Sequence, residues 1–221
     1  MIKDNKLDKY LVIVSKADPM TPEKEAWFAK NFEYVPYTDE DGASKMEVET
    51  FKAYTAFIEH MKKKHHLDVD ARSVYRNIET QEAVYKQMVA EYGEEWAKTH
   101  VAPPGATEHH TALAVDFRYK PSFVPEVLRA QAIAVAKKTG LHKKAFDLIE
   151  QEAVNFGFIK RYDASKEKET GYPGEAWHFR FVGKEHAKAM HSSGMCLEEY
   201  VKLLTLQNQQ AEEAVYGNQP S

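Results

Sequence analysis

Cysteine is almost absent from this sequence of 221 residues, which contains only one, Cys196. A single thiol excludes an intramolecular disulfide framework and any zinc site built from several cysteines. A lone cysteine in a chain of this kind is more often a small buried side chain than a reactive group. We therefore expect Cys196 to take no part in the function.

Long hydrophobic runs are absent as well. The apolar run from Tyr10 to Val14 is too short for a membrane span or a signal-peptide core, and no small-residue cleavage site follows it. We therefore expect a cytoplasmic protein if Met1 is the native start. If a signal segment preceded this sequence, we expect the extracellular or cell-wall side of the membrane.

The sequence also has no strong excess of charge of one sign. Its 30 basic and 34 acidic residues give a formal net charge of −4, and 43% of its residues are hydrophobic. This balance argues against nucleic acid and anionic membranes as partners. The length and the hydrophobic content suffice for one packed core. We expect a single domain at 1–204, followed by a polar C-terminal tail at 205–221.

The spacing of apolar residues predicts a mixture of strands and helices. The predicted strands are 10–15, 67–75, 111–118, 158–162 and 176–182. The predicted helices are 48–66, 79–98, 124–139, 143–156 and 197–204, and a loop is predicted at 36–46. The last two strands are joined by a charged turn at 163–174, as in a hairpin. This pattern favours an α+β fold with a largely antiparallel sheet over a doubly wound parallel one.

The predicted helix at 48–66 ends in a run of basic residues, Lys62-Lys-Lys-His-His66. Cationic side chains in a last turn interact favourably with the helix dipole. Such a run is also found in metal and nucleic-acid sites. The interpretation that we favour here is a solvated helix end.

The segment GATEHHTALAVDF, residues 105–117, places His109 seven positions before Asp116. On one unbroken strand this odd separation would send the two side chains to opposite faces. They can share a site only if His109 lies in a turn before the strand, and the Pro-Pro-Gly sequence at 103–105 makes such a turn plausible. The pair alone is a weak signal for a metal site.

A second segment, GYPGEAWHFRFVG at residues 171–183, adds Glu175 and His178. On the predicted strand His178 shares a face with Arg180, while the aromatic side chains occupy the other face. Two histidines, an aspartate and an additional glutamate fit a hydrolytic zinc centre. Three protein ligands leave a fourth position for water, and a carboxylate that is not a ligand can accept a proton from that water.

These segments resemble the zinc D-alanyl-D-alanine peptidases of the VanY and VanX type, a family of LAS-type metallopeptidases. The family pattern S-x-H-x-x-G-x-A-x-D is similar to Thr107–Asp116, and E-P-W-H is similar to Glu175–His178. An upstream pattern, S-G-Y-R-S-x-x-x-Q, is similar to Ser73–Gln81. The likeness runs from about residue 10 to residue 204. The register of the first motif favours His109 over the neighbouring His110 as a ligand.

The resemblance implies that His109, Asp116 and His178 bind Zn²⁺ and that Glu175 is the general base. It implies that Arg76 stabilises the developing oxyanion or holds the substrate carbonyl. It also implies a central antiparallel sheet flanked by helices. The residues implied in substrate binding are Ser73, Gln81, Thr107 and Trp177; Trp177 is as compatible with the core as with a pocket wall.

Several residues depart from the family motifs. Ala112 replaces a glycine, which matters if that position needs a positive φ angle, and Ala176 replaces a proline. Val74, Asn77 and Thr107 also differ from the motif residues. None of these changes removes an implied ligand, base or cation, so they affect the expected substrate preference rather than the reaction class.

The resemblance therefore implies a zinc D,D-carboxypeptidase, with D,D-dipeptidase activity as an extension, that acts before the C-terminal D-Ala of peptidoglycan precursors. The expected partner is a precursor or muropeptide ending in a D-amino acid. An alternative is an L,D-carboxypeptidase or a peptidoglycan endopeptidase. An alternative of another class is a non-catalytic descendant that binds peptide or zinc.

Overall fold

The structure is a computed structural model that describes residues 8–40, 42–120 and 129–216. Within these ranges the largest sheet has four antiparallel strands in the order β3-β4-β6-β5. A second sheet is the antiparallel hairpin β1-β2. The α+β fold with a largely antiparallel sheet is therefore confirmed. The strands are β1 (Tyr34–Asp39), β2 (Gly42–Glu47), β3 (Asp68–Ser73), β4 (Ala114–Lys120), β5 (Phe158–Tyr162) and β6 (Glu175–Phe181).

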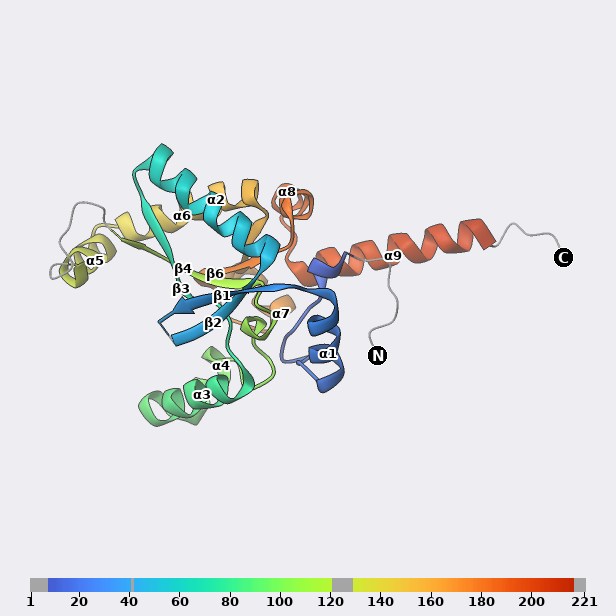
Figure 1. Ribbon diagram of the computed structural model, residues 1–221, viewed down its shortest axis with the longest axis horizontal. Helices are drawn as coiled ribbons and strands as arrows, with labels where there is room; N and C mark the ends of the chain where they lie inside the picture. The colour runs from blue at the N-terminus through green and yellow to red at the C-terminus, as the bar shows by residue number, and fades with distance from the viewer. Residues whose placement is uncertain (1–7, 41, 121–128, 217–221) are drawn as a thin grey trace.

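Two helices, α2 (Val48–His65) and α6 (Leu141–Ala153), cover one face of the four-stranded sheet (Figure 1). Phe117 of β4 and Phe179 of β6 point into this buried layer, and Phe117 packs on Phe57 of α2. Because side chains alternate along a strand, Asp116 and His178 point to the opposite face. The functional side chains thus lie on the face away from the main core.

The helix predicted at 48–66 is confirmed as α2. The Glu47 carboxylate caps its start by accepting a hydrogen bond from the Thr50 N–H, and His66 ends it in the left-handed conformation. The helix predicted at 79–98 is interrupted at Gly93, which separates α3 (Ile78–Tyr92) from α4 (Glu94–His100). Gly93 has a φ angle of 88°, which is incompatible with a continuous helix.

The strand predicted at 10–15 is wrong. Residues Lys9–Leu11 form a 3-10 turn, and the following residues are irregular. The carbonyl groups of Tyr10 and Val12 accept hydrogen bonds from the Arg180 guanidinium, so a buried side chain replaces a neighbouring strand. The apolar side chains of this segment are still packed inward, which explains why the sequence resembles a strand.

The loop predicted at 36–46 is also wrong, because these residues form most of the β1-β2 hairpin. Tyr34 pairs with Glu47 and Asp39 pairs with Gly42. Most side chains of both strands remain partly exposed, so the polar sequence is compatible with a strand.

The remaining elements complete the structure around this frame. The strands predicted at 67–75, 111–118, 158–162 and 176–182 correspond to β3, β4, β5 and β6, while positions 124–128 of one predicted helix lie outside the described residues. The charged turn predicted at 163–174 contains two short helical turns, Ala164–Lys166 and α7 (Glu167–Thr170). Helices that the sequence analysis missed are α1 (Pro22–Asn31) and α8 (Lys184–Ser193). The described part of the helix predicted at 124–139 corresponds to α5 (Arg129–Lys138).

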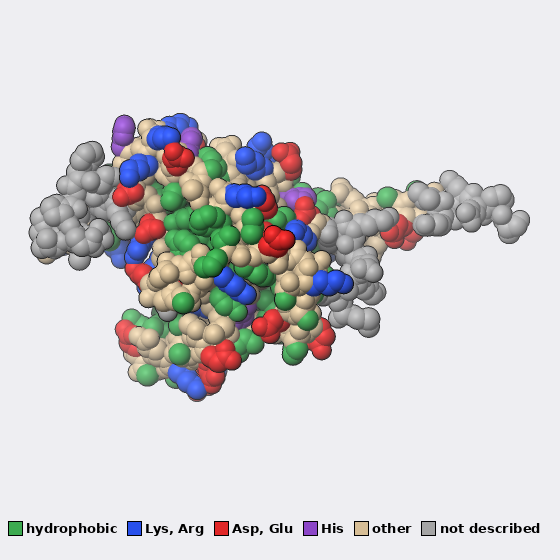
Figure 2. Space-filling view, viewed as in Figure 1, with side chains coloured by type: hydrophobic (Ala, Val, Ile, Leu, Met, Phe, Trp, Pro, Cys, Tyr) green, Lys and Arg blue, Asp and Glu red, His purple; other side chains and the backbone are tan. Residues whose placement is uncertain are grey.

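The last helix, α9 (Leu197–Tyr216), is longer than the predicted 197–204. Its first turns pack on the body of the protein, and the rest projects away from it (Figure 1). No helix in the described ranges is both long and apolar enough to cross a membrane. On the face shown in Figure 2, acidic and basic side chains are interspersed, as the balanced composition predicts.

Candidate metal centre

His109 lies in a turn that directly precedes β4. The turn is a 3-10 helix, Glu108–Thr111, whose first N–H groups are capped by Thr107: its hydroxyl oxygen accepts a hydrogen bond from the His109 N–H at 3.3 Å. Ala112 ends the turn with a φ angle of 58°. The sequence prediction that His109 precedes the strand is therefore confirmed, and the position where the family has glycine does adopt a left-handed backbone.

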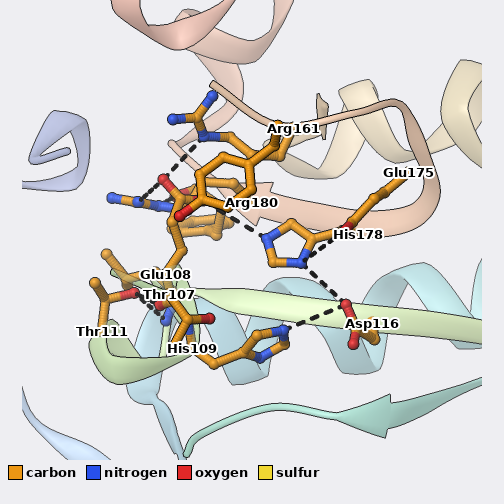
Figure 3. A network of polar contacts seen from close by, with 12 residues as sticks. Thr107, Glu108, His109, Thr111, Asp116, Arg161, Glu175, His178 and Arg180 are labelled. Carbon is orange, nitrogen blue, oxygen red and sulfur yellow. Dashed lines mark hydrogen bonds and ion pairs between the residues drawn. The ribbon is translucent and has the colours of Figure 1, made fainter. Parts of the chain in front are cut away.

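His109, Asp116 and His178 converge on one point (Figure 3). Asp116 and His178 are directly paired across β4 and β6. Asp116 Oδ1 lies 3.3 Å from His109 Nε2 and 3.0 Å from His178 Nδ1. The three ligand atoms are all within 4.8 Å of one another, a spacing that a single metal ion can bridge.

The free atoms at this point fit a metal ion. His109 Nε2 and Asp116 Oδ1 are buried and have no hydrogen-bond partner among the described residues. The other ring nitrogen, His109 Nδ1, lies 2.5 Å from the Val74 carbonyl oxygen and therefore carries the proton. The lone pair of Nε2 is thus directed at Asp116, as in metal sites whose histidines are oriented by a backbone carbonyl.

His110 is excluded from this group by its own contacts. Its Nδ1 lies 2.6 Å from the Arg76 carbonyl oxygen, and its Nε2 accepts a hydrogen bond from the Gly105 N–H. Both ring nitrogens are therefore used to hold the backbone. The geometry agrees with the motif register, which favours His109.

A buried carboxylate behind His178 was missed by the sequence analysis. Glu108 is fully buried, and its Oε2 lies 3.7 Å from His178 Nε2. Its Oε1 accepts hydrogen bonds of 2.9 Å from Arg161 and from Arg180 (Figure 3). Burial alone would raise the pKa of Glu108, but the two guanidinium groups outweigh it and hold the pKa well below its usual range. The signal in the sequence was Arg180, a cation on the face of His178 that requires a buried partner.

The surroundings of His178 favour positive charge. Burial by itself would lower the pKa of His178, but the neighbouring carboxylates of Asp116 and Glu108 raise it to about 9. The pKa of Asp116 is well below its ordinary value, because the two histidines outweigh the effect of burial. A divalent cation meets the same demand for positive charge.

Glu175 stands beside the three converging residues. It is the first residue of β6, and its Oε2 lies 3.8 Å from His178 Nδ1. Burial raises the pKa of Glu175 to about 7. A carboxyl group with such a pKa can both accept and donate a proton near neutral pH.

The Arg76 side chain lies beside Asp116 and is held in place by Gln81. One guanidinium nitrogen of Arg76 is 3.8 Å from Asp116 Oδ2, and another donates a hydrogen bond of 2.7 Å to Gln81 Oε1. The Gln81 amide nitrogen donates to the Ala102 carbonyl, also at 2.7 Å. Both ends of the Gln81 side chain are therefore engaged within the protein.

A cavity of about 130 Å³ opens onto these residues. Thr107 and Trp177 line it, and Trp177 is 45% exposed, so it belongs to the rim rather than to the core. Ser73 is buried opposite Asp116 and is not among the described residues that line the cavity. Lining residues that the sequence analysis did not single out include His100, Tyr162 and Tyr172.

Comparison with known proteins agrees with this geometry. Residues 43–184 match the family described as VanY, D-alanyl-D-alanine carboxypeptidase. The chain belongs to this family. The resemblance inferred from the sequence motifs is thereby confirmed.

Curated members of the VanY family match the central part of the chain. A D-alanyl-D-alanine carboxypeptidase of Enterococcus faecalis is 35% identical over 138 residues, which are 58% of this chain and 46% of the relative. The bifunctional D-Ala-D-Ala dipeptidase and carboxypeptidase VanXYC of Enterococcus gallinarum is 34% identical over 136 residues, 61% of this chain and 67% of the relative. The chain thus spans about half the length of the Enterococcus faecalis relative.

Solved structures of VanY-type and related peptidases share the fold. The vancomycin-resistance D,D-pentapeptidase VanY in complex with Zn(II) has a TM-score of 0.68 at 24% identity, over 87% of this chain and 98% of that chain. The D,D-dipeptidase VanXYg has a TM-score of 0.65 at 27% identity, over 88% and 70%. The L,D-carboxypeptidase LdcB has a TM-score of 0.64 at 27% identity, over 87% and 86%.

Proposed function

We propose that this chain is a zinc-dependent D,D-carboxypeptidase that hydrolyses the peptide bond before the C-terminal D-Ala of a peptidoglycan precursor. The observation that carries the proposal is the convergence of His109, Asp116 and His178 beside Glu175, in a chain of the VanY family. Family membership supports the reaction class, and the geometry supports the assignment of the residues.

The donor atoms suit zinc. Two imidazole nitrogens, from His109 and His178, and one carboxylate oxygen, from Asp116, would hold the ion, and this is a ligand set that zinc uses in hydrolytic enzymes. A VanY structure that shares the fold is a complex with Zn(II). Bound there, zinc would polarise the substrate carbonyl and lower the pKa of a water molecule to about 7. His109 would bind through Nε2, because its Nδ1 proton is held by the Val74 carbonyl.

Glu175 is the group that moves the proton. Its Oε2, beside His178 Nδ1, accepts a proton from the attacking water. The same oxygen then returns the proton to the nitrogen of the leaving amino acid. The raised pKa of about 7 makes both transfers accessible to one carboxyl group near neutral pH.

Arg76 neutralises the charge that develops on the substrate carbonyl oxygen. Its fixed positive charge and planar donors suit this role, and the hydrogen bond from Arg76 to Gln81 fixes the guanidinium before substrate binds. Gln81 therefore acts on the substrate through Arg76. Thr107 and Trp177 line the cavity and are the proposed contacts to the peptide, whereas support for a contact with Ser73 rests on the motif alone.

Substrate length is a separate part of the proposal. The dual activity in the description of VanXYC supports D,D-dipeptidase action as an extension, and the similarity to LdcB makes L,D-carboxypeptidase action a second candidate. Mass spectrometry of the zinc-loaded protein with tri-, tetra- and pentapeptide stems and free D-Ala-D-Ala distinguishes them. We expect loss of D-Ala from the pentapeptide. Cleavage of the tetrapeptide alone would replace the proposal by the L,D activity.

Replacement of the general base tests the mechanism. We expect Glu175→Gln to lower kcat on the pentapeptide by about 10²–10⁴, because the proton transfers are lost while the three ligands remain. Zinc content and kcat are measured on the same preparations. The matched control is Glu169→Gln on α7, where the same change is made to an exposed side chain. If wild type and Glu175→Gln are equally inert on all stems, the result contradicts the proposal and favours the alternative of a non-catalytic binding protein.

A further inference from the structure

A second cluster of metal-ligating side chains lies between the two helices that cover the core face of the sheet. His60 and His65 belong to α2, and Glu152 belongs to α6. His60 Nε2 is 2.8 Å from Glu152 Oε2, and His65 Nε2 is 2.8 Å from Glu152 Oε1. The cluster is on the opposite side of the sheet from Asp116, so it is independent of the proposed catalytic centre.

We propose that His60, His65 and Glu152 form a second binding site for a divalent transition-metal ion of the zinc type, which joins α2 to α6. One atom from each residue, two imidazole nitrogens and a carboxylate oxygen, lies within 4.8 Å of the others. This is a donor set that zinc uses in proteins, with a fourth position left for water. The site is at the last turn of α2, where the helix dipole also favours a cation.

The exposure of the three side chains allows an ion to enter. The side chains of His60, His65 and Glu152 are 30%, 20% and 10% exposed, so the cluster is covered but open at one side. Both contacting nitrogens are Nε2, the ring atom farthest from the backbone. When each imidazole keeps its proton on Nδ1, Nε2 offers a lone pair to the metal.

Lys64 is the competitor for this carboxylate. Its Nζ lies 2.8 Å from Glu152 Oε1, so the ammonium group occupies a carboxylate oxygen that a metal ion would use. The Lys64 side chain is 55% exposed and can turn to solvent when a divalent ion takes its place. We therefore assign metal binding to His60 and His65, whereas the basic run alone predicts a solvated helix end.

Replacement of Lys64 distinguishes a metal site from a simple ionic contact between α2 and α6. If the cluster is only an ionic contact, Lys64→Ala weakens it and adds no affinity for metal. If the cluster binds metal, Lys64→Ala removes a positive charge beside the ion. We then expect the dissociation constant of this site to fall by up to about fivefold, the size of an interaction between partly exposed charges.

Titration of the full, chelator-stripped chain with Zn²⁺ by isothermal calorimetry tests the proposal. We expect two equivalents for wild type, one for His65→Ala and one for His178→Ala. His191→Ala, a change to an exposed histidine on α8, should retain two equivalents and controls for adventitious binding. Thermal unfolding of His178→Ala should shift upward with Zn²⁺, because an ion that binds only the folded state stabilises it.

The measured numbers of Zn²⁺ equivalents distinguish one metal site from two. One equivalent for wild type, lost completely in His178→Ala, overturns the second site and leaves the proposed catalytic centre intact. Two equivalents that persist in His65→Ala also overturn it. Because the wild-type stoichiometry and the Lys64→Ala affinity are measured as well, the result does not depend on whether His65→Ala folds. Peptidase activity is not a readout, so failure of the proposed function leaves this test unaffected.

Discussion

His178 lies between two carboxylates that face different nitrogens of its ring. Nδ1 is 3.0 Å from Asp116 Oδ1, whereas Nε2 is 3.7 Å from Glu108 Oε2 (Figure 3). A neutral imidazole carries one proton, so a proton on Nε2, on the side of Glu108, leaves the Nδ1 lone pair for a cation. Carboxylates in this position are known to orient metal-binding histidines and to raise their basicity. Glu108 is thus the carboxylate placed to orient His178 when a cation binds at Nδ1, although at 3.7 Å it makes no direct hydrogen bond to the ring.

We expect Glu108→Gln to weaken Zn²⁺ binding at this centre by about 10- to 100-fold, the usual effect of removing such a partner. The dissociation constant is measured by competition with a chromophoric chelator, and circular dichroism checks the fold. The control is Glu198→Gln, which removes another carboxylate bonded to Arg161 but leaves Glu108 facing His178. Wild-type affinity in Glu108→Gln would show that Glu108 serves only to neutralise the two arginines.

The sequence could predict the converging residues but not the support behind them. His109, Asp116, Glu175 and His178 are carried by two short motifs that resemble those of the VanY family, and the resemblance rather than the spacing alone implies their roles. The role of Glu108 depends on where Arg161 and Arg180 come to lie in the fold, and no local pattern specifies that. Such residues are recognised only when burial and partners are known.

Among the elements, the N-terminal segment shows that the burial of a segment does not establish its secondary structure. Leu11 and Val14 are buried, as an inward-facing strand would require. The backbone, however, is satisfied by side chains: Arg180 donates to the carbonyls of Tyr10 and Val12, and Lys24 donates to that of Ile13. A short apolar run indicates burial, not the identity of the hydrogen-bond partner, so the sequence could not distinguish the two cases.

The connection between α6 and β5 depends on Gly157. Its φ angle is 91°, and an added Cβ would lie 2.9 Å from a Phe181 ring carbon and 3.0 Å from the Lys184 backbone nitrogen. We expect Gly157→Ala to lower the free energy of unfolding by about 2–4 kcal/mol, from backbone strain and overpacking together. Gly140→Ala is the control: its φ angle is 75°, no described atom lies within 4 Å of the added Cβ, and about 1–2 kcal/mol is expected. Equal losses in urea unfolding would refute the packing argument.

The contact between α2 and α6 should depend on acid. Hydrogen bonds from Lys64, and then from His60 and His65, lower the pKa of Glu152 to about 2 from its ordinary 4.5. A carboxyl group whose pKa is lower in the folded state stabilises the protein above about pH 4.5 and loses this effect as the pH falls toward 2. In chelator at pH 5, Glu152→Gln should therefore be less stable than wild type, with the difference shrinking below pH 4.5 in urea unfolding. A difference that is constant with pH would contradict this assignment.

At the scale of the whole molecule, the segment around Leu11 packs against the start of the last helix. Leu197, at the start of α9, is buried in a cluster with Leu11 and with residues of β5 and α8. Farther along the same helix, residues 209–214 are exposed, and α9 projects from the body (Figure 1). One continuous helix therefore has a first part that belongs to the core and a later part that does not. The domain boundary predicted at residue 204 lies within this helix and stays a prediction.

Two variants of α9 test that boundary. Truncation after Gln210 removes residues whose described side chains, at 211–214, are all exposed, so we expect it to change the free energy of unfolding by less than about 0.5 kcal/mol. Leu197→Ala leaves a cavity at a fully buried position and should cost about 2–5 kcal/mol. Both are measured by urea unfolding at one pH in the same buffer. If the truncation destabilises the chain as much as Leu197→Ala, the projecting half of α9 is part of the folded domain, and the polar segment is more than a tail.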